Sequence, residues 1–179
     1  MEISELVNFG ISVTDSEKYQ NLLDMSELAC AKFCDRETFS LSNYSFFADG
    51  ASYDRLVLPI TPVADLSLYF SKDRDFSIPI PTNKYRLDSV TGVITFYDRE
   101  ILTAKGRDII KAEYTAGYEE LPKDIQACIA MTFQYASKIL SSSQIGITTR
   151  NLDGGTESIE QSLPPLVVKK MLTKYKKAN

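Results

Sequence analysis

The chain has 179 residues, of which 44% are hydrophobic and 25% are charged, and these values are ordinary for one globular domain. The net charge is −4, from 24 acidic and 20 basic residues, which argues against tight binding to nucleic-acid phosphates. The chain contains no histidine, so it lacks the most common general base and the most common zinc ligand.

The first predicted helix begins near Thr14. Thr14 and Glu17 have the spacing of a capping box, in which each side chain accepts a hydrogen bond from a free backbone N–H. Apolar residues then recur at helical spacing and predict one apolar face, made of Tyr19, Leu22, Leu23, Ala29, Cys30 and Phe33. Residues 43–50 end this period with asparagine, serine, aspartate and glycine.

A β-rich region is predicted over residues 44–114. Residues 63–70 and 107–114 alternate between apolar and polar side chains, which is typical of strands with one buried face. Residues 85–97 predict an antiparallel hairpin, because two strand-like runs flank a turn that contains glycine.

A second long helix is predicted to begin at Pro122, because proline is favoured at the first helical position. Its apolar stripe is wide, which predicts either a central place in a helical core or a contact with a partner subunit. The stripe contains Ile125, Cys128, Ile129, Thr132, Ala136, Ile139 and Leu140, widened by Phe133 and Tyr135.

The last part of the chain combines a polar segment with a short helix. Residues 141–162 are rich in serine, threonine and glycine, which predicts a flexible arm. Two prolines then open a last helix, in which Val168, Leu172 and Tyr175 share one face. Its lysines fit two readings, a solvated helix end or a basic tail that docks on an acidic partner surface.

Together these elements predict a single α+β domain over residues 1–179. We expect a helical bundle of three to four helices with an inserted antiparallel β-hairpin or small sheet region. No apolar run approaches the ~20 residues of a membrane span, and the N-terminus lacks the pattern of a signal peptide. A cytoplasmic protein with reduced thiols is therefore expected.

No catalytic, cofactor or metal site is predicted. Cys30 and Cys34 would share a helix face, but two thiols on one helix need further ligands that no histidine can supply. Packing in an apolar face is the better interpretation of both. The sequence also lacks a phosphate-binding glycine loop and a nucleophile elbow.

Several short segments follow one another in an order that is more specific than any of the segments alone. They are residues 34–39 at a helix end, 56–63 with Leu-x-Leu-Pro-x-x-Pro-Val, 85–94 with Thr-Gly, 110–118 with Tyr-x-Ala-Gly-Tyr, 121–125 with Leu-Pro-x-Asp-Ile, and 163–177. In this order the chain resembles the head–tail connector (neck adaptor) family of tailed bacteriophages. The β-rich region here is larger than in the minimal helical connectors.

The resemblance implies a structural virion protein and not an enzyme. It implies a ring of about twelve subunits beneath the portal protein, which extends the DNA channel and joins head to tail. The next partner would be a stopper or tail-completion protein, and DNA would pass without sequence-specific binding. The implied location is the neck of the virion, after assembly in the host bacterial cytoplasm.

A candidate interface with the portal or with neighbouring subunits follows from this resemblance. A head-to-tail ring needs two different patches on each subunit. We assign to the interface the widened face of the second long helix, the arm and the last helix, with residues Phe133, Tyr135, Ile145, Ile147, Leu152, Ile159, Leu166, Val168, Leu172, Tyr175, Lys176 and Lys177. A chain shortened from Ser162 is expected to fold and to lose portal binding.

Three alternatives stay open at this point. The first is a tail-completion or stopper-type neck protein. The second is a monomeric binding module that uses a β-sheet face. The third is a small enzyme that uses carboxylates alone, which would need a concave pocket holding two carboxylates of perturbed pKa.

Overall fold

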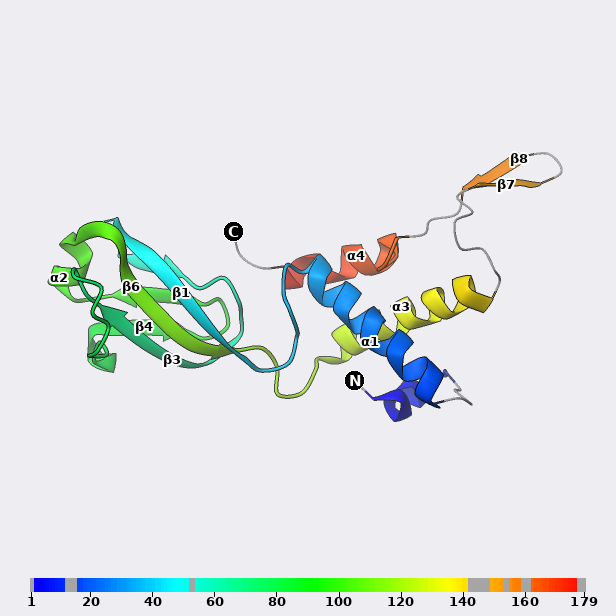
Figure 1. The fold of residues 1–179 in the computed structure, drawn as a ribbon, viewed down its shortest axis with the longest axis horizontal. Helices are drawn as coiled ribbons and strands as arrows, with labels where there is room; N and C mark the ends of the chain where they lie inside the picture. The colour runs from blue at the N-terminus through cyan, green and yellow to red at the C-terminus, as the bar shows by residue number, and fades with distance from the viewer. Residues whose placement is uncertain are drawn as a thin grey trace. The chain divides into compact units, whose positions relative to one another are not determined.

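The computed structural model describes residues 2–11, 16–51, 54–141, 149–152, 155–158 and 162–176. It confirms the mixed α+β class (Figure 1). The chain divides into two compact units, which are described separately below. Unit 1 comprises Met1–Thr38 and Leu121–Lys176, and unit 2 comprises Phe39–Glu120 and Lys177–Asn179.

Unit 1 is mainly helical. It contains η1 (Ile3–Phe9), α1 (Ser16–Phe33), α3 (Lys123–Ser141), α4 (Leu166–Leu172) and η3 (Thr173–Tyr175). Helices α1, α3 and α4 contact one another. Their buried stripes form the core of the unit, with Leu22, Leu23 and Cys30 from α1, Ile125, Cys128, Ile129 and Phe133 from α3, and Val168 and Leu172 from α4.

These helices confirm the main sequence predictions for this unit. Helix α3 begins directly after Pro122, and Pro165 is the N-cap of α4. The predicted start at Thr14 lies outside the described residues. The predicted stripe of α3 is buried as far as Ala136, but Leu140 at its end is 53% exposed, so the stripe is shorter than predicted.

The first sheet of unit 2 is built around one long strand. Strand β6 (Lys105–Ala116) lies between β1 (Ser42–Ala51) and β3 (Val63–Phe70), and both pairings are antiparallel. Burial alternates along β1 and, as predicted, along the second half of β6. In β3 the predicted apolar residues Leu66, Leu68 and Phe70 pack on the core, although burial along the strand does not alternate strictly. The inward side chains of β6 include Ile110, Ala112 and Tyr114.

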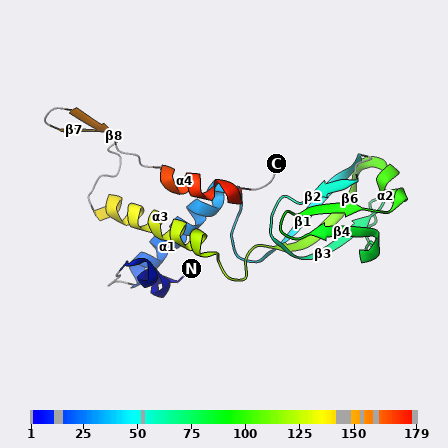
Figure 2. The same ribbon diagram turned by 180° about the vertical axis from the view of Figure 1, so that it is seen from behind.

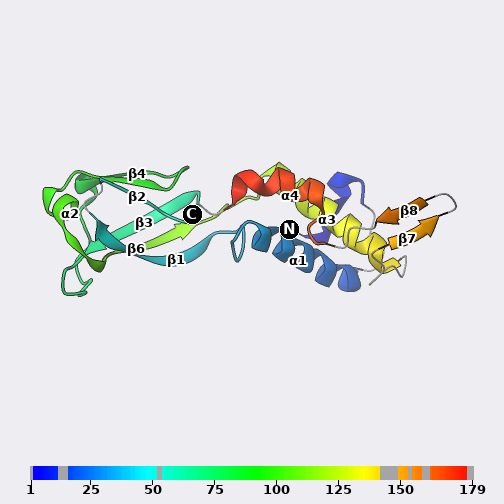
Figure 3. The ribbon, with the colours of Figure 1, turned by 90° about the horizontal axis from the view of Figure 1, so that it is seen from above.

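The second sheet has β5 (Val93–Phe96) between β2 (Arg55–Val57) and β4 (Tyr85–Asp88). The β4–β5 pairing confirms the predicted hairpin. The turn η2 (Thr82–Lys84) precedes β4, and α2 (Arg99–Thr103) connects β5 to β6. Figure 3 shows the two sheets of this unit as two layers, and their inner faces share one hydrophobic core.

The sequence patterns did not predict several elements of the fold. Strand β1 covers the stretch that was interpreted only as the end of a helical period. Helix α2 has five residues, and Asp98 caps it by accepting a hydrogen bond from the backbone N–H of Glu100. The predicted arm contains a hairpin of β7 (Thr149–Leu152) and β8 (Gly155–Ser158), labelled also in Figure 2.

The turn after β6 requires glycine at position 117. Its φ of +124° is rarely adopted by other residues, and a Cβ there would lie 2.4 Å from the carbonyl oxygen of Ser40. The Gly117 N–H donates a hydrogen bond to the carbonyl of Pro62 at 2.9 Å. This close approach of three segments explains the Tyr-x-Ala-Gly-Tyr pattern and confirms that its glycine is needed by the turn.

Replacing this glycine should therefore destabilise unit 2. Gly117→Ala combines an unfavourable φ with a backbone collision, and we expect it to lower the free energy of unfolding by about 2 kcal/mol or more. Urea unfolding followed by circular dichroism measures the change. Gly10→Ala is the control, since Gly10 has a positive φ but a Cβ added there would meet no atom within 4 Å. Equal losses for both variants would contradict the role of the collision.

Candidate assembly surfaces

The end of the described chain is tied to the start of α3 by a polar network. The Tyr175 hydroxyl donates to Asp124 Oδ2 at 2.5 Å, and Lys174 Nζ lies 2.6 Å from the same oxygen. The Arg36 side chain is 5% exposed, and its Nε donates to the carbonyl of Tyr175 at 3.1 Å. The last turn is therefore anchored both to α3 and to the segment that follows α1.

The charges of this network are mutually stabilised. The ammonium of Lys174, together with the hydrogen bond from Tyr175, holds the pKa of Asp124 below its usual value. The same carboxylate raises the pKa of Lys174. Burial, and then the hydrogen bond to Asp124, raises the pKa of Tyr175 to about 12. At neutral pH the network therefore holds an ionised aspartate, a charged lysine and a protonated tyrosine.

The network should contribute a pH-dependent part of the stability of unit 1. The pKa of Asp124 in the folded state lies below 3.8, so its ionised form stabilises the fold above that pH. This contribution is lost as the pH falls through the folded-state pKa. Asp124 is 38% exposed, so we expect Asp124→Asn to cost about 1 kcal/mol or less at pH 7.

Urea unfolding of both proteins from pH 7 down to pH 3 measures the difference in the free energy of unfolding. The difference should shrink toward the acidic end of this range. Glu37→Gln, at an exposed position of the same unit, is the control. A difference between wild type and Asp124→Asn that stays constant over the whole range would contradict the assignment.

Helix α4 has exposed apolar side chains beside its buried face. Val168 and Leu172 are fully buried against the unit, whereas Val167 and Met171 are 53% and 40% exposed. Leu166 and Leu163, at and before the start of the helix, are 54% and 38% exposed. Grouped exposed apolar side chains are typical of a surface that contacts another molecule. We call Leu163, Leu166, Val167 and Met171 the α4 apolar face.

The predicted interface residues fall into different environments. Phe133, Val168 and Leu172 are at most 2% exposed in the folded unit. Their side chains fill the core between α1, α3 and α4, where a partner cannot reach them while the unit is folded. The structure also corrects the expected effect of deleting residues from Ser162, because the deletion would remove part of this core.

Four of the other predicted interface residues are not in the core. Tyr135 and Tyr175 are half-buried, and Leu166 and Lys176 are exposed. The Lys176 ammonium lies 4.5 Å from the centre of the Phe33 ring. Leu152 belongs to β7. The remaining members lie outside the described residues; they are Ile145, Ile147, Ile159 and Lys177.

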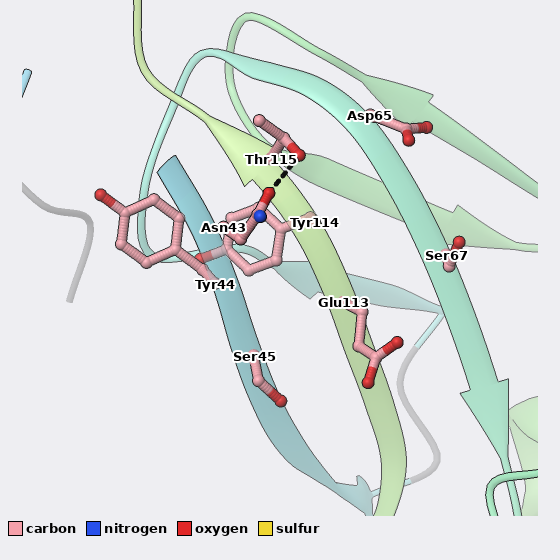
Figure 4. A pocket seen from close by; sticks show the side chains of 8 residues that line it. All are labelled: Asn43, Tyr44, Ser45, Asp65, Ser67, Glu113, Tyr114 and Thr115. Carbon is pink, nitrogen blue, oxygen red and sulfur yellow. Dashed lines mark hydrogen bonds between the residues drawn. The ribbon is translucent and has the colours of Figure 1, made fainter. Parts of the chain in front are cut away.

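Unit 2 has an open hollow on the outer face of the β1–β6–β3 sheet (Figure 4). Two carboxylates, Asp65 and Glu113, line it beside serine, threonine and asparagine side chains. Thr115 donates a hydrogen bond to Asn43 at 2.8 Å, drawn as the dashed line in Figure 4. Sequence reasoning had not singled out any of these residues, because nothing in their spacing shows that three strands bring them together.

The hollow does not have the chemistry of a carboxylate enzyme. Lys111 lies 2.5 Å from Glu113 and lowers the pKa of that carboxyl group. A general acid of this kind needs a raised pKa so that it holds a proton near neutral pH. The geometry therefore fits a polar contact surface better than a glycan-cleaving site.

The cysteines also have no features of a reactive site. Burial raises the pKa of Cys30 to about 12 and the pKa values of Cys34 and Cys128 to about 11, so all three thiols stay protonated at neutral pH. Among the described residues, no group of three or more cysteine and acidic side chains could hold a metal ion. In the same part of the chain, no helix is long and apolar enough to cross a membrane.

The fold thus defines an α+β protein in which a β-sandwich unit is inserted, in sequence, between helices α1 and α3. The features described above that could contact another molecule are the α4 apolar face and the polar hollow of unit 2. Solved structures with the same fold come from gene transfer agent (GTA) particles. A chain described as "Neck of empty GTA particle computed with C6 symmetry" matches with a TM-score of 0.59 and 15% identity, over 100% of this chain and 90% of that chain. No protein-family model and no curated protein sequence matches.

Two further structures show the same likeness. "Neck of native GTA particle computed with C12 symmetry" matches with a TM-score of 0.58 and 16% identity, over 99% of this chain and 88% of that chain. "Virion of native gene transfer agent (GTA) particle" matches with a TM-score of 0.55 and 15% identity, over 94% and 81%. The resemblance to head–tail connectors is thereby confirmed at the level of the fold.

Proposed function

We propose that this chain is a structural neck protein, which forms a ring beneath the portal of a tailed virion. The ring would extend the DNA channel and join head to tail. The observation that carries the proposal is the likeness in fold to chains of neck structures computed with C12 and C6 symmetry, which covers 99% and 100% of this chain. A ring of about twelve subunits agrees with the sixfold and twelvefold symmetry of those necks.

The partners follow from this place in the particle. The portal would lie on one side of the ring, and a stopper or tail-completion protein on the other. DNA would pass through without sequence-specific binding, which agrees with the net charge of −4. The location would be the neck of the virion, after assembly in the cytoplasm of the host bacterium.

The α4 apolar face is the best-supported contact with the portal or with a neighbouring copy. Burying its exposed side chains on a partner would remove apolar surface from water, which stabilises most protein assemblies. The β7–β8 hairpin is a second contact element. A two-stranded hairpin is marginally stable alone, and packing on a neighbour would stabilise it.

Co-expression with the portal protein of the same genome tests the proposal. Affinity isolation followed by negative-stain imaging should show stoichiometric rings that cap the portal. Isolated copies without the portal can be monomeric, so the complex is the informative sample. A folded chain that binds no portal would favour a stopper-type protein or a monomeric binding module instead.

Val167→Glu combined with Met171→Gln tests the α4 apolar face in the same assay. The two positions are exposed, so we expect the free energy of unfolding to change by about 0.5 kcal/mol or less. Capping of the portal should be lost or fall at least about tenfold. Val7→Glu is the matched control, because Val7 is 67% exposed in the same unit but lies in η1. Normal capping by the double variant would exclude this face from the contact.

A further inference from the structure

Two arginines flank a threonine on the outer face of the β2–β5–β4 sheet. The strand register places Arg55 and Arg86 on either side of Thr95. Ile94 and Phe96, the neighbours of Thr95 along β5, are buried in the core, so Thr95 and its two partners face outward. Both arginines are exposed and line a hollow. We call Arg55, Thr95 and Arg86 the arginine row.

The same hollow also contains one carboxylate, that of Asp88. Its Oδ1 accepts hydrogen bonds from the backbone N–H groups of Val90 and Thr91, at 3.1 and 3.3 Å. The carboxylate is therefore engaged in its own turn, where a hydrogen bond from the Thr91 side chain, together with these two bonds, lowers its pKa. The two guanidinium groups outnumber it, so this face favours an anionic partner.

The hollow on the outer face of the β1–β6–β3 sheet is lined by carboxylates in place of arginines. The register aligns Asn43, Thr115 and Asp65 in one row. The next row on this face contains Ser45, Glu113 and Ser67, and we call the two rows the carboxylate rows. Within the described residues, the lining of the hollow over these rows includes no lysine or arginine.

Lys111 lies one row further along the same face and pairs with Glu113. It is 24% exposed, whereas Glu113 is 47% exposed, so the carboxylate is the more accessible partner. Asp65 is also exposed, and its Oδ1 accepts a hydrogen bond from the N–H of Leu66. Both carboxylates can therefore accept further hydrogen bonds from a partner.

The two faces point in opposite directions. The inward side chains of both sheets, such as Phe96 and Ala112, belong to one core. Side chains that alternate with them must point away from that core on either side. One copy therefore presents arginines on one side of unit 2 and carboxylates on the other. A head-to-tail ring requires two such different and complementary patches on every subunit.

We propose that in the ring the arginine row of each copy docks on the carboxylate rows of the next copy. This inference rests on the proposed ring. Guanidinium and carboxylate groups form charge-assisted hydrogen bonds with defined geometry. A face of three strands by four residues measures roughly 14 by 13 Å. That is well below the roughly 800 Å² per partner of a stable interface, so this contact sets orientation and register while other surfaces add affinity.

Charge reversal tests the contact in complexes with the portal. Arg55→Glu combined with Arg86→Glu should reduce ring assembly at least about tenfold, because two carboxylate faces would then meet. Asp65→Lys combined with Glu113→Lys should reduce ring assembly by a similar factor, because two cationic faces would then meet. Unfolding curves of both variants check that they fold. Arg99→Glu, at an exposed position in α2, is the control that should assemble normally.

Mixing the two charge-reversed variants should restore assembly. Each contact would then join an acidic face of one variant to a basic face of the other, and a ring with an even number of subunits can alternate the two. The chain that carries all four substitutions should also assemble. A merely structural role of these residues would not be rescued by mixing.

Cross-linking identifies the contact directly. Thr95→Cys and Ser67→Cys occupy the two opposite faces, and the natural cysteines are buried. Oxidation of portal-bound rings should link copies in mixtures of the two single variants, and neither variant should link to itself. Self-linking of either variant would overturn the head-to-tail arrangement.

The outcomes separate this inference from the proposed function. Normal rings from Arg55→Glu/Arg86→Glu would overturn the contact and leave the neck ring standing. If these rings form normally but no longer retain DNA, the contact between copies would be overturned, and the arginines would instead bind the phosphates of DNA. A wild-type chain that forms no ring on the portal would overturn the proposed function, and this contact with it.

Discussion

The alternation of side chains along β6 is the constraint on which the rest of unit 2 depends. This strand pairs with β1 on one side and β3 on the other, so its register sets the orientation of the whole first sheet. Ala112 and Tyr114 enter the core, and Glu113 between them is forced to the outer face. A shift by one residue would bury the glutamate and expose the core. The core and the polar outer face are therefore two consequences of one alternation.

In unit 1 the last helix, α4, is too short to be stable alone, so contacts with the rest of the unit must stabilise it. Seven residues form too few backbone hydrogen bonds to offset the cost of helix nucleation. Val168 and Leu172 anchor α4 in the core, and the contacts of Tyr175 with Asp124 and Arg36 hold its end. With its position determined in this way, the helix can present exposed apolar side chains next to its buried face. A surface that is held in place before binding loses less conformational entropy when a partner covers it.

A protein that acts through surfaces needs groups whose charge does not change under working conditions. Asp124 and Glu113, whose pKa values are lowered, are ionised at neutral pH, and the three buried thiols, whose pKa values are raised, are protonated. The described residues thus combine stable charges with buried, unreactive sulfur. In the proposed ring, such constant charges would favour defined contacts between subunits.

The sequence by itself determined the elements with a clear period or a clear boundary signal. The apolar stripes of α1 and α3, the Pro122 start, the β4–β5 hairpin and the alternation of β6 could all be predicted, because these patterns depend on neighbours along the chain. Gly117 belongs to the same group, although the collision that explains it involves Ser40, far away in sequence.

Other features were decided by the tertiary structure alone. In β1, the alternation of Tyr44, Phe46 and Ala48 is masked by Phe47, which lies on the outer face, so only pairing with β6 reveals the strand. The same holds for burial in α4, where Val167 and Val168 are alike in chemistry and adjacent in sequence, yet Val167 is half-exposed and Val168 is fully buried. The arginine and carboxylate rows join residues from different strands, and only strand pairing makes them neighbours. Local patterns specify which face is apolar, whereas packing between distant segments decides which face stays exposed to meet a partner.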